Sequence, residues 1–245
     1  KNDAPEGSAE KILPLAIPES GEYKVVIVGA WQTNTYTGLY SGGQSNNTNR
    51  INIQQRIVSN ITEINPEATF TYLTSYGNST SSSSYTITAA DVETIANADA
   101  VIVVTGTPEN YSREDGDRAS IALPNGQAEL ISNVGKINPK TIAVMETCGP
   151  MQVTTFEDDV AAILWSSYQG LRKTGFGDVI TGKVNPSGKT TDTWYKNVSN
   201  TGESDLTSIY DYDLFPSEGK QGRTYMYFTG TPSYPFGYGL SFTTF

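Results

Sequence analysis

The stretch Ala100-Val-Ile-Val-Val-Thr105 decides the fold, because its hydrophobicity is continuous instead of alternating. A strand with this pattern is buried on both faces, as strands are in the parallel sheets of α/β proteins. Four similar short runs are bounded by glycine, proline or polar residues, and they lie at residues 25–28, 70–73, 142–145 and 162–165. The sequence therefore predicts five buried strands.

Helical patterns separate these strands. Residues 50–64 place isoleucines on one stripe, with Asn49 as the expected N-cap, and Thr88-Ala-Ala-Asp91 begins like a capping box. A third pattern covers residues 124–137 and a weaker one covers 170–181. Alternating strands and helices predict a three-layer α/β/α sandwich around a mainly parallel sheet of about five or six strands. The sixth would be an edge strand near residues 190–194.

Composition excludes several classes of function. The net charge is −10 and histidine is absent, which argues against nucleic-acid binding and against imidazole-based catalysis or metal sites. No apolar run approaches the ~20 residues of a membrane span. Many Ser, Thr, Asn and Tyr residues with few Lys suit a secreted or cell-surface protein that handles polar, neutral ligands. The single Cys148 is expected to be a small buried residue.

No cofactor is predicted. The segment from Gly182 to Thr190 looks like a phosphate-binding loop, but five residues separate its glycines where that motif has four. Asn185-Pro-Ser-Gly188 is instead typical of a turn. No glycine-rich dinucleotide motif follows the first strand.

The candidate site follows the strand at residues 100–105, where open α/β sheets bind their ligands. This loop carries four carboxylates and two arginines, and they are Glu109, Glu114, Asp115, Asp117, Arg113 and Arg118. From the residues alone, Glu114 is either a solvated loop carboxylate, paired with an arginine, or a proton donor or sugar ligand. Glycoside cleavage needs two carboxyl groups, and no second convincing one is evident. Asp117 and Arg118 are expected to be a structural pair that shapes the loop.

A second polar loop follows the first strand, over residues 36–47. It is either a flexible loop or a sugar platform, in which Tyr40 would stack on a ring and Gln44, Ser45 and Asn46 would bind hydroxyls. A third loop, rich in Ser and Thr, covers residues 75–85. Because all three follow parallel strands, they are expected to meet at one edge of the sheet.

The chain is predicted to have a sandwich core over residues 1–196 and an aromatic-rich tail over residues 197–245. So many rings need a surface to pack on, so the tail is expected to pack back onto the same domain. Tyr225, Tyr227 and Phe228 alternate in part like a strand.

The order of motifs resembles the C-terminal α/β/α-sandwich domain of glycoside hydrolase family 3, the β-glucosidase and β-xylosidase family. The resemblance spans the whole chain. It is carried by Lys1-Asn-Asp3 with Ile12-Leu-Pro-Leu15, Tyr40-Ser-Gly-Gly-Gln-Ser-Asn46, Gly106-Thr-Pro-Glu109 with Glu114-Asp-Gly-Asp-Arg118, Leu123-Pro-Asn-Gly-Gln-Ala-Glu-Leu-Ile131, Gly177-Asp-Val-Ile-Thr-Gly-Lys-Val-Asn-Pro-Ser-Gly-Lys189 and Tyr234-Pro-Phe-Gly-Tyr-Gly-Leu-Ser-Phe-Thr-Thr-Phe245.

The resemblance implies a function that this chain shares with a partner. In the family, an N-terminal barrel supplies an Asp nucleophile, and a Glu at the position of Glu114 is the acid and base in retaining hydrolysis of terminal β-linked sugars. Glu109 would contact substrate or only begin the loop. The chain alone is then expected to be inactive, and its partners would be a carbohydrate and the barrel domain.

An alternative is a non-catalytic carbohydrate-binding or interdomain module on the same fold. Two departures from the family pattern keep it open: Asp115 replaces a usual glycine, and Leu171-Arg-Lys173 lacks the usual Glu and Gly pair.

Overall fold

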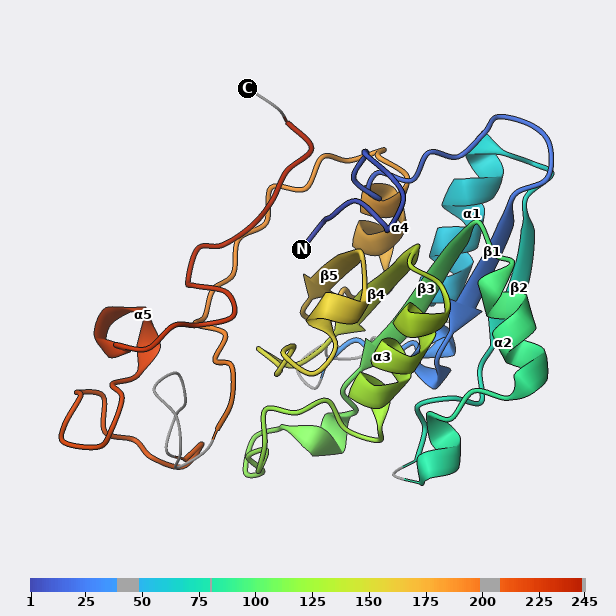
Figure 1. The fold of residues 1–245 in the computed structure, drawn as a ribbon. Coiled ribbons are helices and arrows are strands. Elements are labelled where there is room, and N and C mark those ends of the chain that lie inside the picture. Colours follow the sequence, from blue (N-terminus) through green and yellow to red (C-terminus); the bar gives the residue numbers. More distant parts are fainter. Residues whose placement is uncertain (39–48, 80, 199–207, 244–245) are drawn as a thin grey trace.

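The computed structural model describes residues 1–38, 49–79, 81–198 and 208–243. Within them, five strands form one parallel sheet in the order β2-β1-β3-β4-β5 (Figure 1). The strands are β1 (Lys24–Val28), β2 (Thr69–Leu73), β3 (Ala100–Gly106), β4 (Thr141–Glu146) and β5 (Ala162–Ser166). All five predicted strands are present, but β2 is not buried as predicted, because it is an edge strand whose residues are exposed or half-buried.

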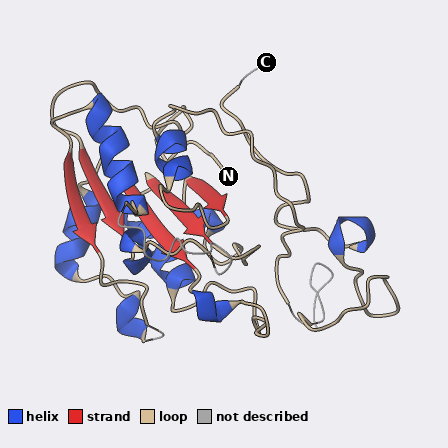
Figure 2. Cartoon of the chain, turned by 180° about the vertical axis from the view of Figure 1, so that it is seen from behind, coloured by secondary structure: helices blue, strands red, loops and turns tan. Residues whose placement is uncertain are grey.

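Helices cover both faces of the sheet and complete the three layers (Figure 2). On one face α1 (Ile53–Ile64) packs against α4 (Thr174–Ile180), and on the other α2 (Ala89–Ala96) lies beside α3 (Gln127–Ile137). The predicted α/β/α sandwich is therefore confirmed. Within the described part of the chain, no helix has the length and hydrophobicity needed to cross a membrane.

Strand β3 shows why continuous hydrophobicity predicted this fold. Every residue of β3 is buried. Val101 and Val103 pack into the core beneath α2 and α3, while Ile102 and Val104 pack into the core beneath α1 and α4. Successive side chains of a strand point to opposite faces, so a strand with a core on each face needs an apolar residue at nearly every position.

Local capping chemistry fixes where the helices begin. Thr88 caps α2 as predicted, since its hydroxyl accepts from the Asp91 N–H at 3.2 Å. The predicted cap of α1 at Asn49 is wrong, because Asn52 is the cap. The Asn52 side chain accepts from the Gln55 N–H and the Gln55 side chain accepts in return from the Asn52 N–H, which satisfies both orphan donors.

Two expectations about strands in the last third of the chain are wrong. Residues 190–194 form no sixth strand in the described sheet; Trp194 makes only an isolated antiparallel bridge to Tyr234. The residues expected to alternate like a strand instead contribute to a short helix, α5 (Thr224–Tyr227). The partial alternation failed because, among the described residues, no strand lies beside this segment to pair with it.

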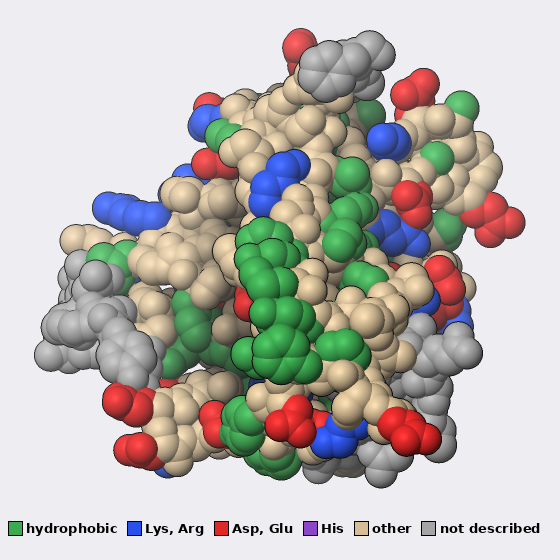
Figure 3. Space-filling view, turned by 90° about the vertical axis from the view of Figure 1, so that its left-hand side faces the viewer, with side chains coloured by type: hydrophobic (Ala, Val, Ile, Leu, Met, Phe, Trp, Pro, Cys, Tyr) green, Lys and Arg blue, Asp and Glu red, His purple; other side chains and the backbone are tan. Residues whose placement is uncertain are grey.

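The tail meets the sandwich at a ring cluster beside β5. The Trp194 ring lies edge-on to Trp165 at 5.3 Å and to Tyr234 at 5.9 Å, and Phe242 packs against the core beneath α1 and α4. Earlier in the tail, Tyr212, Phe215 and Tyr225 are largely exposed. Figure 3 shows hydrophobic side chains gathered on the face of the molecule where the tail lies.

Candidate functional site

The loop after β3 presents Glu114 at the tip of a tight turn. A short 3-10 helix, η4 (Glu109–Tyr111), opens the loop, and Glu109 is exposed. Arg113 and Gly116 then exchange two backbone hydrogen bonds of 3.0 and 3.1 Å across Glu114 and Asp115. Asp115 has a φ of 61°, in the left-handed region that favours glycine but that Asp tolerates. The turn therefore forms without the glycine, and it leaves Glu114 exposed.

The side chain of Tyr111 closes this loop. Its hydroxyl lies 3.0 Å from the carbonyl oxygen of Ser120 and 2.5 Å from that of Ala122. Burial raises the pKa of Tyr111, which extends the pH range over which its hydroxyl can donate. The two ends of the loop are thus held together while its tip stays in solvent.

The base of the loop is fixed through the backbone of Gly106. The Gln127 amide accepts from the Gly106 N–H at 2.8 Å and donates to the Gly106 carbonyl at 3.0 Å, with all atoms buried. A Cβ on Gly106 would lie 2.1 Å from the Trp31 ring, so only glycine fits where β3 ends. Gln127 and Gly106 belong to two separate sequence motifs, and the fold brings them into contact.

Thr107 connects the loop to two neighbouring loops. Its hydroxyl accepts from the Cys148 N–H at 2.9 Å and lies 3.0 Å from the Tyr168 hydroxyl, which also lies 3.1 Å from the Thr107 carbonyl. Burial raises the pKa of Tyr168 to about 12. Cys148 itself is half-buried at the rim of the core, so it is less buried than expected.

A buried ion pair lies beneath these loops. Lys173 Nζ and Glu146 Oε1 are 2.5 Å apart, and neither side chain has any exposed surface. The same carboxylate accepts from the Gln169 N–H at 3.0 Å and from the Trp31 indole at 3.1 Å. Desolvation by burial lowers the pKa of Lys173, and the Glu146 carboxylate opposes this shift.

The loop after β1 contacts the ion pair at Tyr36, because Lys173 Nζ donates to the Tyr36 carbonyl at 2.5 Å. The four predicted sugar ligands, Tyr40, Gln44, Ser45 and Asn46, lie outside the described residues. The described ends of this loop, the loop after β2 and the loop after β3 all follow strands of one parallel sheet. Their predicted convergence on one edge is therefore confirmed for those segments.

The Arg118 side chain contacts the loop after β4. Its guanidinium donates to the Pro150 carbonyl at 2.7 Å and approaches the Met151 sulfur at 3.5 Å. Among the described residues no ion pair joins it to Asp117, which is exposed. Whether the two residues shape the loop as a pair stays a prediction.

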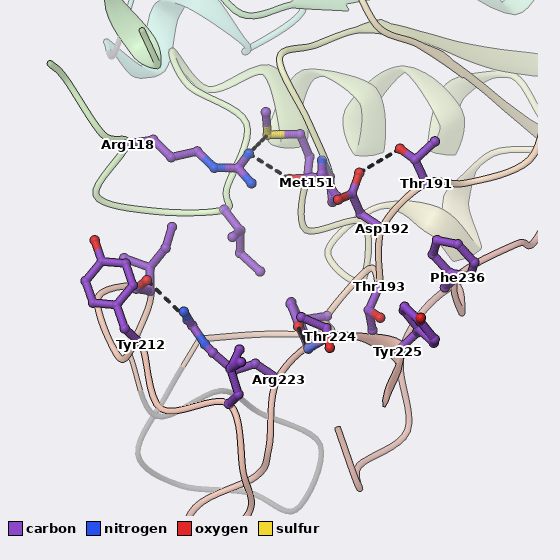
Figure 4. Close-up of a pocket in the computed structure, with 15 residues that line it drawn as sticks. Arg118, Met151, Thr191, Asp192, Thr193, Tyr212, Arg223, Thr224, Tyr225 and Phe236 are labelled. Carbon is purple, nitrogen blue, oxygen red and sulfur yellow. Dashed lines mark hydrogen bonds between the residues drawn. The ribbon is translucent and has the colours of Figure 1, made fainter. Parts of the chain in front are cut away.

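Arg118 also lines a cleft between the sandwich and the tail (Figure 4). The cleft has a volume of about 450 Å³. Figure 4 shows Arg118 and Met151 on one side and Arg223 and Tyr212 on the other. Arg223 is held there by the Ser208 and Ile209 carbonyls, at 2.8 and 3.1 Å.

Sequence reasoning missed the polar groups under the loops. Glu146 is a carboxylate directly after the apolar run Ile142-Ala-Val-Met145, and that position is a usable signal, because a buried charge requires a partner. Its partner Lys173 is 27 residues away, in a segment with no matching signal. Across the described residues, no group of three or more carboxylates and thiols could hold a metal ion.

The arrangement provides an exposed carboxyl group, Glu114, on a loop that is fixed at its base and closed by a tyrosine. Such a group can give a proton to a molecule bound at this edge or take one from it.

A comparison with protein families gives one match over nearly the whole chain: residues 1–242 match the glycosyl hydrolase family 3 C-terminal domain. Curated relatives include an exo-1,4-β-xylosidase of Aspergillus niger, 31% identical over 97% of this chain and 29% of the relative. A β-D-xylosidase of Arabidopsis thaliana is 34% identical over 60% of this chain and 19% of the relative. The chain thus spans less than a third of the relatives it matches.

Solved structures give the same picture. A GH3 exo-β-xylosidase, solved with a xylobiose aziridine activity-based probe, superposes with a TM-score of 0.76 at 28% identity. The match covers 95% of this chain and 29% of that one. A β-glucosidase of Chaetomium thermophilum superposes with a TM-score of 0.69 at 22% identity and covers 99% of this chain and 30% of that one. The second match shows the fold alone.

Proposed function

Because the chain belongs to glycosyl hydrolase family 3, as its C-terminal domain, we propose that it supplies the acid/base carboxyl group of a retaining β-glycosidase, and that this group is Glu114. The observation that carries the proposal is the place of Glu114. It is exposed at the tip of a structured turn, on the loop that follows the central strand of the sheet.

The reaction has two steps, and Glu114 acts in both. In the first, the bond between the sugar C1 and the leaving oxygen breaks, Glu114 gives its proton to that oxygen, and C1 bonds to a carboxylate nucleophile. In the second, water attacks C1, its proton passes to Glu114, and the ester bond to the nucleophile breaks. The chain matches 29% of a xylosidase relative, so we assign the role of nucleophile to an Asp of a barrel domain in the same polypeptide.

Terminal β-linked sugars are the proposed substrates, and β-xylosides are the first to test. Several relatives are named as xylosidases, and the structural match at 28% identity is an exo-β-xylosidase. The loop after β1, with Tyr40, Gln44, Ser45 and Asn46, would contribute contacts to the sugar. Glu109 would lie near the same ligand, because it opens the loop that carries Glu114.

The test uses the whole polypeptide encoded by the reading frame that contains this chain. Glu114→Gln should lower kcat/KM on alkyl β-xylosides by about 10²–10⁴-fold, because their leaving oxygen needs a proton. On dinitrophenyl β-xylosides the first step needs little proton donation, so the loss there should be smaller, and added azide should restore turnover as the β-xylosyl azide. Glu10→Gln is the control, since it removes an exposed charge outside the Glu114 loop.

Equal losses on both substrates, without rescue by azide, would refute an acid/base role for Glu114. The 245-residue chain alone should not turn over either substrate appreciably. Efficient turnover by the isolated chain, unaffected by Glu114→Gln, would contradict both parts of the proposal. A reading frame without a barrel domain would favour a non-catalytic carbohydrate-binding module.

A further inference from the structure

The buried ion pair between Glu146 and Lys173 costs desolvation energy, and its contribution to the stability of the fold does not explain why it is present. Both side chains are completely buried. Replacing such a pair by apolar residues is often neutral or stabilising, so its presence is weak evidence of a role in stability. Lys173 also sits at a φ of 47°, a left-handed conformation that is unfavourable for a residue other than glycine.

The ammonium of Lys173 also contacts the loop after β1. Besides Glu146, its ammonium donates to the backbone carbonyl of Tyr36 at 2.5 Å. Next to it, Arg50 donates to the Thr35 carbonyl at 3.2 Å. Two cations thus hold the successive carbonyls of Thr35 and Tyr36, seven and eight residues after β1 ends.

Tyr168 extends this unit to the loop that carries Glu114. Its ring meets the Tyr36 ring edge-on at 4.8 Å, and its hydroxyl contacts both the side chain and the carbonyl of Thr107. Gln169, the next residue, donates its N–H to Glu146. The segment from Tyr168 to Lys173 therefore contacts the bases of both loops and the buried carboxylate between them.

We propose that the Glu146–Lys173 pair, with Tyr168, is a positioning unit that sets the loop after β1 and the Glu114 loop relative to each other. Lys173 holds the first loop by its ammonium, Tyr168 holds the second by its hydroxyl, and Glu146 keeps the ammonium charged and fixed. The functional meaning of this role rests on the proposed function of Glu114. The structural part of the proposal does not rest on Glu114, because it concerns only how well ordered the two loops are.

The structural test uses the 245-residue chain and four variants. Glu146→Gln and Lys173→Met each remove one charge, and the double variant removes both without leaving a buried ion unpaired. Lys183→Met is the matched control, since Lys183 forms an exposed ion pair with Glu63 at 3.1 Å. Melting temperature reports overall stability, and amide hydrogen exchange reports the local order of residues 35–38 and 107–112.

Each single variant should lower the melting temperature, because it leaves a buried charge alone. The double variant should recover most of that loss, yet its amides at residues 35–38 should still exchange at least about ten-fold faster than in the parent chain, because no ammonium holds the Tyr36 carbonyl. The control should change neither. A double variant with parent-like exchange at residues 35–38 would overturn the proposal.

Tyr168→Phe keeps the test decisive if the charge variants do not fold. It removes one hydroxyl and keeps the ring against Tyr36, so the first loop should stay protected while exchange at residues 107–112 rises several-fold. In the whole polypeptide it should lower kcat on alkyl β-xylosides with little change in KM. Unchanged exchange at residues 107–112 would contradict the role of Tyr168. If the exchange results hold while Glu114→Gln has no effect on activity, the positioning unit stands and the proposed function fails.

Discussion

The sandwich and the tail contain the same types of aromatic residue, but the sandwich buries them and the tail leaves many of them exposed. In the sandwich, Phe156 is 1% exposed and packs beneath α3, in a core that strands of the sheet complete. In the tail, Phe215 is 64% exposed and its ring contacts only that of Tyr227 among the described rings, at 4.6 Å. A buried ring contributes through many contacts at once, whereas an exposed one contributes little.

The difference shows where the stability of the chain originates. In the sandwich, the strands pair with one another and helices cover both faces of the sheet, so hydrogen bonding and apolar burial act together. In its described residues the tail has isolated bridges, backbone hydrogen bonds to Thr190 and Trp194, and the four-residue helix α5. The rings that it places against Trp194 therefore contribute much of its order. The predictions below test this contrast, starting with the largest effect.

Ending the chain at residue 197 should cost the sandwich about 5 kcal/mol and make it prone to aggregate. The cut removes the rings of Tyr234, Tyr238 and Phe242 and uncovers Trp194, and a buried ring is worth about 1.5–3 kcal/mol. Thermal unfolding and sedimentation of the shortened chain measure both effects. A monomer with an unchanged melting temperature would instead make the tail a docking segment for another domain.

Phe156→Ala should lower the free energy of unfolding by about 3–5 kcal/mol, because it opens a cavity in the core. Phe215→Ala is the matched change in the tail, and it should cost no more than about 1 kcal/mol, the value of one ring pair. Urea denaturation of both variants gives the comparison directly. Equal losses would mean that the tail is as tightly packed as the sandwich.

Alkaline pH should destabilise the sandwich through Tyr23, which is 7% exposed. Burial, aided by the Asp99 carboxylate, raises the pKa of Tyr23 from 10.0 to about 12. The unfolded chain therefore ionises first, and stability that is intact below pH ~10 is lost as the pH rises toward ~12, by at most about 2.7 kcal/mol. Unfolding free energies of Tyr23→Phe measured across this range should fall less steeply. Tyr212→Phe, in the exposed tail, should follow the parent chain.

Thr88→Ala should cost about 1 kcal/mol, because it removes the hydroxyl that caps α2. Thr94→Ala is the control in the same helix, and it should change stability by less than about 0.5 kcal/mol, since alanine is the better helix former. Helix α5 in the tail has no capping side chain. A loss at Thr88 no larger than at Thr94 would mean that α2, like α5, depends on its surroundings and not on its cap.

Most of the fold could be predicted because its signals are local. A strand buried on both faces must be apolar throughout, so the run at residues 100–105 predicted β3 without any partner being known. The cap of α1 was misplaced because two asparagines compete, and only Asn52 has Gln55 three residues ahead to complete the box. The strand expected at residues 190–194 failed for a different reason, since an edge strand forms only where a neighbour has the right register.

The sequence by itself determined the five strands, the order of the helices, the loop that carries Glu114 and the family of the chain. Only the tertiary structure decided what holds that loop: the Gln127 amide on Gly106, the Tyr168 hydroxyl on Thr107 and the Glu146–Lys173 pair beneath the loops. The physical reason is range. Hydrophobic periodicity and caps act within a few residues, whereas a buried charge or amide must find a partner wherever the packed chain brings one, here 21 to 61 residues away.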